Sequence, residues 1–206
     1  MKILIAVPCM DMVSSRFAKS LATVQKPCDT AIAFQIGSLV YESRNKLAAQ
    51  AIRYEADYVM WFDSDMEFAP DTLTKLFGHC QNGLDIVSGI YFRRVAPFKP
   101  VLFSKLSRTE GHEGFDNYPK NALFEIAGCG FGCVLMKTDV LLDIAGQSHD
   151  WFSPVEGYGE DLSFCIRARE AGYKIYCDSR IKCGHVGYVT VDETAYDSFR
   201  NVGEQK

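Results

Sequence analysis

Short continuous apolar runs alternate with helix-spaced apolar stripes along the first 90 residues of the chain. The continuous runs are typical of strands in a sheet that is covered on both faces, and they lie at residues 2–7, 30–36, 57–62 and 85–88. The helical stripes lie between them, at residues 15–26, at residues 43–54 and in a segment that opens with Pro70 and Asp71. This order predicts an α/β fold in which helices flank a Rossmann-like, mostly parallel sheet.

The second half of the chain has a different pattern. Residues 105–122 are polar and rich in glycine, asparagine and charge, which predicts a long loop of the kind that often carries function. Apolar residues resume at Leu123, and the glycine-rich stretch "EIAGCGFGCVLMKTDVL" predicts a smaller antiparallel strand pair. A helix is predicted for residues 160–171, followed by two short strands around Ile175 and Ile181.

Length and composition narrow the class of protein. A chain of 206 residues fits one domain, and 48% hydrophobic with 23% charged residues is ordinary for a globular fold. A formal net charge of −4 gives no basic footprint for nucleic acid, so no nucleic-acid partner is predicted. We see no secretory signal and no apolar run near the roughly 18 residues of a membrane span. The sequence therefore predicts a cytoplasmic protein and leaves a homo-oligomer open.

In the cytoplasm the eight cysteines are expected to be reduced thiols, and most of them are expected to be small core residues. A zinc site is the alternative. It would use Cys129 with Cys133, or Cys177 with Cys183 and His185, but neither cysteine pair has the compact spacing of a structural zinc motif.

Carboxylates follow the third predicted strand in the stretch "YVMWFDSDMEF", residues 58–68. Ligands of open α/β sheets bind beyond the carboxyl ends of the strands, so Asp63 and Asp65 are expected at a ligand site. Carboxylate oxygens suit Mg²⁺ or Mn²⁺. A turn with two solvated aspartates is the alternative, and the Asp-x-Asp pattern alone does not decide between them.

Two longer stretches carry a family resemblance. "SRNKLAAQAIRYEADYVMWFDSD" and "YGEDLSFCIRAREAGYKIYCDSRIKCGHVG" resemble the Asp-x-Asp and Glu-Asp motifs of GT-A fold glycosyltransferases, particularly the inverting family 2 type. The resemblance implies a single GT-A domain over residues 1–190 with a C-terminal tail at 191–206. It also implies metal-dependent transfer of a sugar from a nucleoside diphosphate to a hydroxyl of a carbohydrate or other acceptor, with inversion, by an enzyme of the hexosyltransferase type.

The resemblance also implies roles for single residues. Asp161 is the expected base that takes the acceptor's proton, and Glu160 beside it would bind acceptor hydroxyls. The expected metal ligands are Asp63, Asp65 and His185, and the imidazole favours Mn²⁺ over Mg²⁺. The expected donor contacts are Pro8, Arg44, Asn45, Asp63 and Ser64, with UDP as the expected nucleotide.

The sequence departs from the family pattern in two places. The first strand ends in "PCMD". The aspartate that often contacts the nucleobase of the donor has no clear counterpart, which leaves the identity of that nucleobase undefined.

Four other classes of protein remain alternatives. A retaining glycosyltransferase on the same fold would form no inverted product. An inactive sugar-nucleotide-binding module would carry damaged motifs, whereas both motifs are intact. A phosphatase of the haloacid dehalogenase type places its Asp-x-Asp after the first strand, and a nucleotidyltransferase needs a glycine-rich loop there, which residues 7–20 lack.

Overall fold

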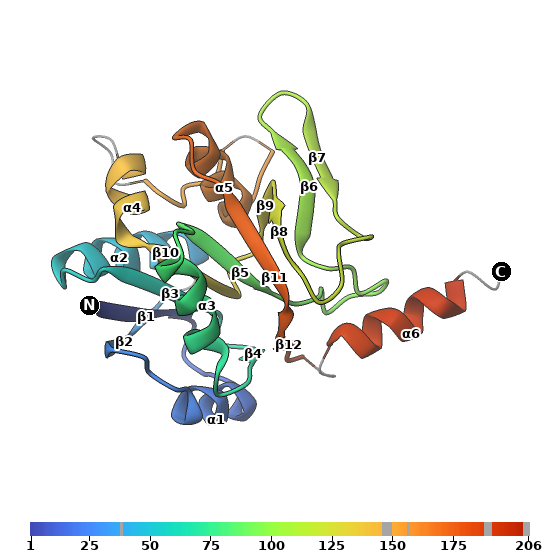
Figure 1. The fold of residues 1–206 in the computed structure, drawn as a ribbon, viewed down its shortest axis with the longest axis horizontal. Coiled ribbons are helices and arrows are strands. Elements are labelled where there is room, and N and C mark those ends of the chain that lie inside the picture. The colour runs from blue at the N-terminus through green and yellow to red at the C-terminus, as the bar shows by residue number, and fades with distance from the viewer. Residues whose placement is uncertain (38, 146–149, 156, 188–190, 204–206) are drawn as a thin grey trace.

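A seven-stranded sheet forms the centre of the computed structural model, which describes residues 1–37, 39–145, 150–155, 157–187 and 191–203 (Figure 1). The strand order is β2-β1-β3-β10-β5-β11-β8. The strands are β1 (Lys2–Cys9), β2 (Asp29–Ile36), β3 (Tyr58–Phe62), β5 (Ile86–Ile90), β8 (Leu123–Ile126), β10 (Cys133–Lys137) and β11 (Ile175–Lys182). β1 pairs in parallel with β2 and β3, and β5 pairs in parallel with β11, whereas β10 and β8 run antiparallel to their neighbours. The predicted α/β class is confirmed.

Helices cover both faces of this sheet. They are α1 (Ser15–Thr23), α2 (Val40–Arg53), α3 (Thr72–Gln81), α4 (Thr138–Ala145) and α5 (Glu160–Glu170). A further helix, α6 (Glu193–Gly203), extends away from the sheet (Figure 1). One apolar cluster joins the sheet to α2, α4 and α5, and a second joins it to α1 and α3. Side chains of a strand alternate between faces, so Leu4 of β1 enters the first cluster and Ile5 the second. The continuous apolar runs therefore reflect burial on both sides.

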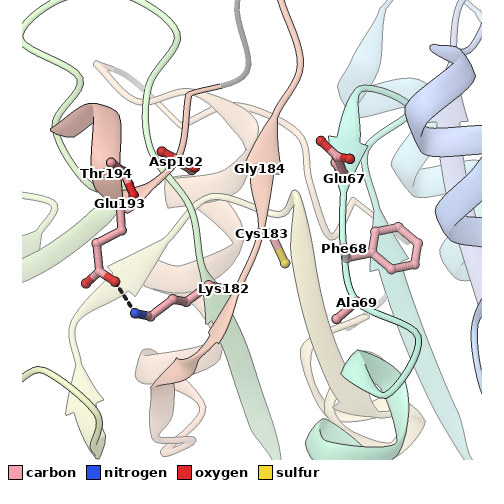
Figure 2. Close-up of a pocket in the computed structure, with 9 residues that line it drawn as sticks. All are labelled: Glu67, Phe68, Ala69, Lys182, Cys183, Gly184, Asp192, Glu193 and Thr194. Carbon is pink, nitrogen blue, oxygen red and sulfur yellow. Dashed lines mark ion pairs between the residues drawn. The ribbon is translucent and has the colours of Figure 1, made fainter.

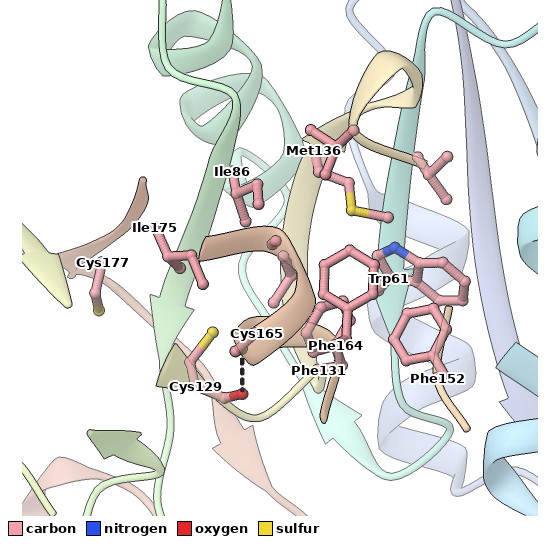
Figure 3. Packing of buried hydrophobic residues seen from close by; sticks show 14 of the residues in the cluster. Trp61, Ile86, Cys129, Phe131, Met136, Phe152, Phe164, Cys165, Ile175 and Cys177 are labelled. Carbon is pink, nitrogen blue, oxygen red and sulfur yellow. Dashed lines mark hydrogen bonds between the residues drawn. The ribbon is translucent and has the colours of Figure 1, made fainter. Parts of the chain in front are cut away.

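Aromatic rings fill the first cluster beneath α5. Trp61 of β3 lies against Phe131 and Phe152, with ring centres 6.1 and 5.0 Å away, and Phe164 of α5 stacks on Phe152 at 4.7 Å (Figure 3). Six of the eight cysteines are buried as free thiols, as the sequence predicts. Figure 3 shows Cys129 and Cys165 on the side of these rings, whereas Cys177 lies further away beside Ile175.

Two small antiparallel sheets accompany the main one. β4 (Met66–Glu67) pairs with β12 (Gly184–His185), and the other sheet has the order β7-β6-β9, from β6 (Leu102–Ser107), β7 (Gly111–Gly114) and β9 (Gly128–Cys129). The smaller antiparallel part is thus confirmed, but it does not lie within residues 125–141. β8, β9 and β10 pair with β11, with β6, and with β3 and β5, not with one another.

Two further segments differ from the sequence prediction. Residues 105–122 include most of the β6–β7 hairpin instead of a continuous loop, and β11 is one strand where two were predicted. None of the helices described is long and apolar enough to cross a membrane. The predicted domain boundary at residue 190 stays a prediction.

The C-terminal segment carries a helix that the sequence analysis did not predict. Tyr196 of α6 is 5% exposed and stacks on Phe92, with ring centres 5.1 Å apart. Glu193, at the start of α6, accepts hydrogen bonds from Tyr118 (2.7 Å) and Lys120 (3.0 Å) and forms a close ion pair with Lys182. Figure 2 shows that pair beside a pocket of about 420 Å³ between α6 and β4. These contacts hold α6 against the domain.

Acid is expected to remove the stability that Glu193 contributes. Burial raises its pKa, but the hydrogen bonds from Lys182, Tyr118 and Lys120 outweigh burial and lower the pKa from 4.5 to about 2. A lowered pKa means that the contribution is present above about pH 4.5 and is lost as the pH falls toward 2. We expect Glu193→Gln to lower the free energy of unfolding by about 1–2 kcal/mol at pH 7, less than the full shift because both lysines are partly exposed.

Urea unfolding of both proteins between pH 7 and pH 3 measures this difference, which should shrink toward acid pH. Glu125→Gln, which removes the exposed pair with Lys174, is the control and should change stability little. A Glu193→Gln difference that stays constant across the pH range would contradict the assignment.

Candidate active site

A cleft of about 850 Å³ opens where β1 and β3 end. In open α/β sheets this edge is where ligands bind. The cleft contains every predicted site residue except Asn45; these are Pro8, Arg44, Asp63, Ser64, Asp65, Glu160, Asp161 and His185. The two sequence motifs, about 100 residues apart in the chain, therefore meet in one place.

Arg44 of α2 lies beneath three of the carboxylates. Its Nη2 is 2.8 Å from Asp63 Oδ1 and 3.4 Å from Asp161 Oδ1, and its Nε is 3.7 Å from Glu160 Oε1. The side chain is only 1% exposed. Burial lowers its pKa, but the three carboxylates outweigh burial and raise it, so the guanidinium stays charged.

Aromatic rings hold that guanidinium in place. Its Cζ lies 5.9, 5.6 and 5.8 Å from the ring centres of Trp61, Phe131 and Phe152. Ring faces attract a cation, and more strongly where water is excluded. Arg44 was predicted to contact the donor, and the structure shows it directed at the carboxylates of the cleft.

One arginine balances only part of the charge of three carboxylates, and the pKa of Asp161 reflects this imbalance. Burial raises the pKa of Asp161 to about 8, with Glu160 and Asp63 adding to the rise and Arg44 offsetting part of it. The N-terminus of a helix favours an ionised carboxylate, but burial beside two like charges outweighs that effect at the start of α5. A base whose pKa lies near neutrality is suited to general-base catalysis.

Asp65 faces a different set of groups. The pairing of β12 with β4 places His185 opposite Met66, next to Asp65. His185 Nε2 lies 3.5 Å from Asp65 Oδ2, and its Nδ1 donates to the carbonyl oxygen of Phe92 at 2.8 Å. Arg94 Nη1 lies 2.9 Å from the same Asp65 oxygen. Burial raises the pKa of Asp65, but the hydrogen bond and charge of His185, together with Arg94, bring it below its ordinary value.

Asp65 and His185 fit a divalent cation in chemistry and orientation. A metal-bound histidine usually donates its other ring N–H to a carbonyl or carboxylate, and His185 does so while its Nε2 faces Asp65. Asp63 has a different partner, because its Oδ1 accepts a hydrogen bond from Arg44 at 2.8 Å. Across the described residues, no group of three or more His, Cys, Asp or Glu side chains is placed to hold a metal. The structure thus brings Asp65 and His185 together, and a metal site that also uses Asp63 stays a prediction.

Asn45 supports the cleft from outside it. Its Oδ1 accepts a hydrogen bond from the backbone N–H of Phe152 (2.8 Å), and its Nδ2 donates to Ser153 Oγ (3.3 Å). These bonds fix the segment that leads toward α5. The sequence analysis expected Asn45 to contact the donor, whereas the structure places it against this segment.

Tyr91 is a cleft residue that the sequence analysis did not identify. Its hydroxyl accepts a hydrogen bond from the N–H of Gly132 (3.2 Å), and its ring meets that of His185 edge-on at 5.5 Å. A Cβ at Gly130 would lie 2.0 Å from the Tyr91 hydroxyl, and one at Gly132 would lie 2.9 Å from Cζ. The glycine spacing was a visible signal, but it does not reveal that a tyrosine fills the space.

Comparison with known proteins identifies the family of this chain. The family model of glycosyl transferase family 2 matches residues 32–144, more than half of the chain. The chain belongs to glycosyl transferase family 2 and is a glycosyltransferase that uses a nucleotide-sugar donor and an acceptor. The matched segment includes the Asp-x-Asp motif but ends before Asp161 and His185.

Solved structures show the same fold beyond that segment. The crystal structure of A197 from STIV is 20% identical, covers 91% of this chain and 86% of its own, and has a TM-score of 0.67. At this identity the likeness shows the fold alone. No curated protein matches the chain.

Proposed function

We propose that the protein is a metal-dependent, inverting glycosyltransferase of the hexosyltransferase type, with a UDP-sugar as the favoured donor. The observation that supports this proposal is one cleft that holds both a buried carboxylate suited to act as a base, Asp161, and a carboxylate–imidazole pair suited to hold a cation, Asp65 with His185. An acceptor and a donor diphosphate would thus meet in the same cleft.

In the proposed reaction, the hydroxyl oxygen of the acceptor attacks the anomeric carbon of the donor while Asp161 takes the proton of that hydroxyl. The bond from that carbon to the diphosphate oxygen breaks on the opposite side, and the diphosphate leaves with the electron pair. Glu160 orients acceptor hydroxyls, and Arg44 holds Asp161 and Asp63 in position. Pro8, Ser64 and Asp63 contact the donor. A bound Mn²⁺ or Mg²⁺ supplies positive charge for the leaving diphosphate.

Asp65→Asn is expected to abolish metal-dependent binding of UDP. An amide keeps the size of the side chain but removes the charge that attracts a divalent cation, and amides are weaker ligands than carboxylates. Calorimetry of UDP binding with Mn²⁺ and with EDTA measures the effect: wild type should bind only with Mn²⁺, and Asp65→Asn should bind poorly under both conditions.

Glu67→Gln is the matched control, because Glu67 lies two residues further on and pairs with Arg16. It should bind UDP as wild type does. UDP binding that is equally strong in EDTA would contradict the metal dependence. Donor binding without any release of UDP from UDP-sugars would instead favour the inactive binding module.

A further inference from the structure

The guanidinium of Arg94 lies among groups that a divalent cation would use. Its Nη1 is 2.9 Å from Asp65 Oδ2 and donates to the carbonyl oxygen of Val186 at 3.3 Å. His185 Nε2 approaches the same Asp65 oxygen at 3.5 Å. The guanidinium thus contacts a carboxylate oxygen and a backbone carbonyl oxygen, and an imidazole nitrogen approaches the same carboxylate oxygen.

These three atom types are also divalent-metal ligands, since oxygen ligands suit Mg²⁺ and Mn²⁺ and imidazole suits the later metals. Two cations at contact distance repel each other. A metal that binds Asp65 through Oδ2, the oxygen facing His185, therefore competes with Arg94 for that oxygen.

Arg94 is free to move in a way that Arg44 is not. Its side chain is 48% exposed, whereas that of Arg44 is 1% exposed and enclosed by rings. Partly exposed ion pairs contribute at most about 1 kcal/mol, so a metal can compete for Asp65. Arg94 lines the cleft, where a donor diphosphate would offer its guanidinium a new anionic partner.

We propose that Arg94 occupies the cation position in the free enzyme and transfers to the donor diphosphate when metal and donor bind together. This inference rests on the proposed function, since it requires a metal-dependent donor site. It implies that metal and donor strengthen each other's binding, because the donor diphosphate becomes a new anionic partner for Arg94 when the metal binds Asp65. Such coupling is reciprocal.

Titration of Mn²⁺ into the protein by calorimetry, with and without UDP, tests the proposal in wild type and in Arg94→Met. Without UDP, we expect Arg94→Met to bind Mn²⁺ about three- to fivefold more tightly than wild type, the range set by a partly exposed ion pair. The factor by which UDP tightens Mn²⁺ binding should be at least about threefold smaller in Arg94→Met.

Arg93→Met is the matched control. Arg93 lines the same cleft, so this variant removes an equal charge one residue away. A change in Mn²⁺ affinity that both variants share comes from the overall electrostatic field of the cleft. The extra tightening should belong to Arg94→Met alone.

Two outcomes overturn the inference and can be told apart. If wild type binds Mn²⁺ with UDP but Arg94→Met behaves as Arg93→Met does, Arg94 does not compete for the cation and the proposed function stands. If wild type binds no Mn²⁺ even with UDP, the metal-dependent function fails and the inference fails with it.

Discussion

Asp161→Asn is expected to lower turnover by about 10²- to 10⁴-fold, the usual contribution of a positioned base. The amide fills the same space at the start of α5 but cannot accept the acceptor's proton. Donor binding should persist, because Asp65 lies in the turn between β3 and β4 and His185 lies on β12, both outside α5. Release of UDP from a UDP-sugar in the presence of acceptor, measured beside calorimetric UDP binding, separates the two effects.

Asp139→Asn provides the matched control, since Asp139 also lies in the first turn of a helix, α4, but outside the cleft. Its turnover should equal that of wild type. Near-normal turnover of Asp161→Asn would leave Asp161 with only a helix-end role and make Glu160 the next candidate. The product of an α-linked donor should be β-linked. A product that keeps the donor's configuration would place the enzyme in the retaining class.

Arg44→Met is expected to lower the free energy of unfolding by about 3–5 kcal/mol, the usual cost of removing one partner from a buried ion pair. Methionine fills much of the space between the rings, so the loss is mainly electrostatic. Asp63, Glu160 and Asp161 would then face one another without their shared cation. Urea unfolding at neutral pH measures the loss.

Two further variants test that explanation. Arg108→Met removes an exposed pair with Glu170 and should cost less than about 1 kcal/mol. Adding Asp63→Asn to Arg44→Met removes one of the unbalanced charges and should restore part of the lost stability. If Arg44→Met unfolds like wild type, the carboxylates do not depend on Arg44, and its place in the cleft needs another explanation.

The sequence predicts the central strands well because burial on both faces leaves a clear signal. β1 and β3 appear as continuous apolar runs, and their side chains alternate between the two apolar clusters. Strand partners have no comparable local signal. β9 has two residues and pairs with β6, and β10 inserts between β3 and β5. Such pairing depends on the path of the whole chain, which the apolar pattern does not describe.

Helix ends, too, are predicted only where the sequence carries a local signal. α1 begins after Ser14, whose Oγ accepts the N–H of Phe17 at 3.0 Å, and its start was predicted. α2 begins at Val40, three residues before the predicted start, and Leu39 before it offers no side-chain cap. Without a capping residue the sequence contains no sign of the boundary.

For the cleft, the sequence identifies the acidic motifs but not their partners. Asp63 and Asp65 are separated by one residue, yet Asp63 binds Arg44 and Asp65 faces Arg94 and His185. These partners come from three other parts of the chain. The family resemblance implies that both carboxylates bind the metal, whereas their contacts in the structure direct them to different cationic side chains.

The reversed direction of β10 decides where the chain tolerates a change of length. Because β10 runs against β3 and β5, its beginning lies at the edge of the sheet that carries the chemistry, and Gly132 just before it accepts a hydrogen bond from the N–H of Asp63 (3.3 Å). Its end lies at the opposite edge, where Thr138 donates to the carbonyl of Asp57 (2.9 Å). An insertion just before β10 would therefore disturb the floor of the cleft, whereas one at the other end of β10 would fall at the opposite edge of the sheet. A change of length at that opposite edge would therefore leave the reactive groups of the cleft in place.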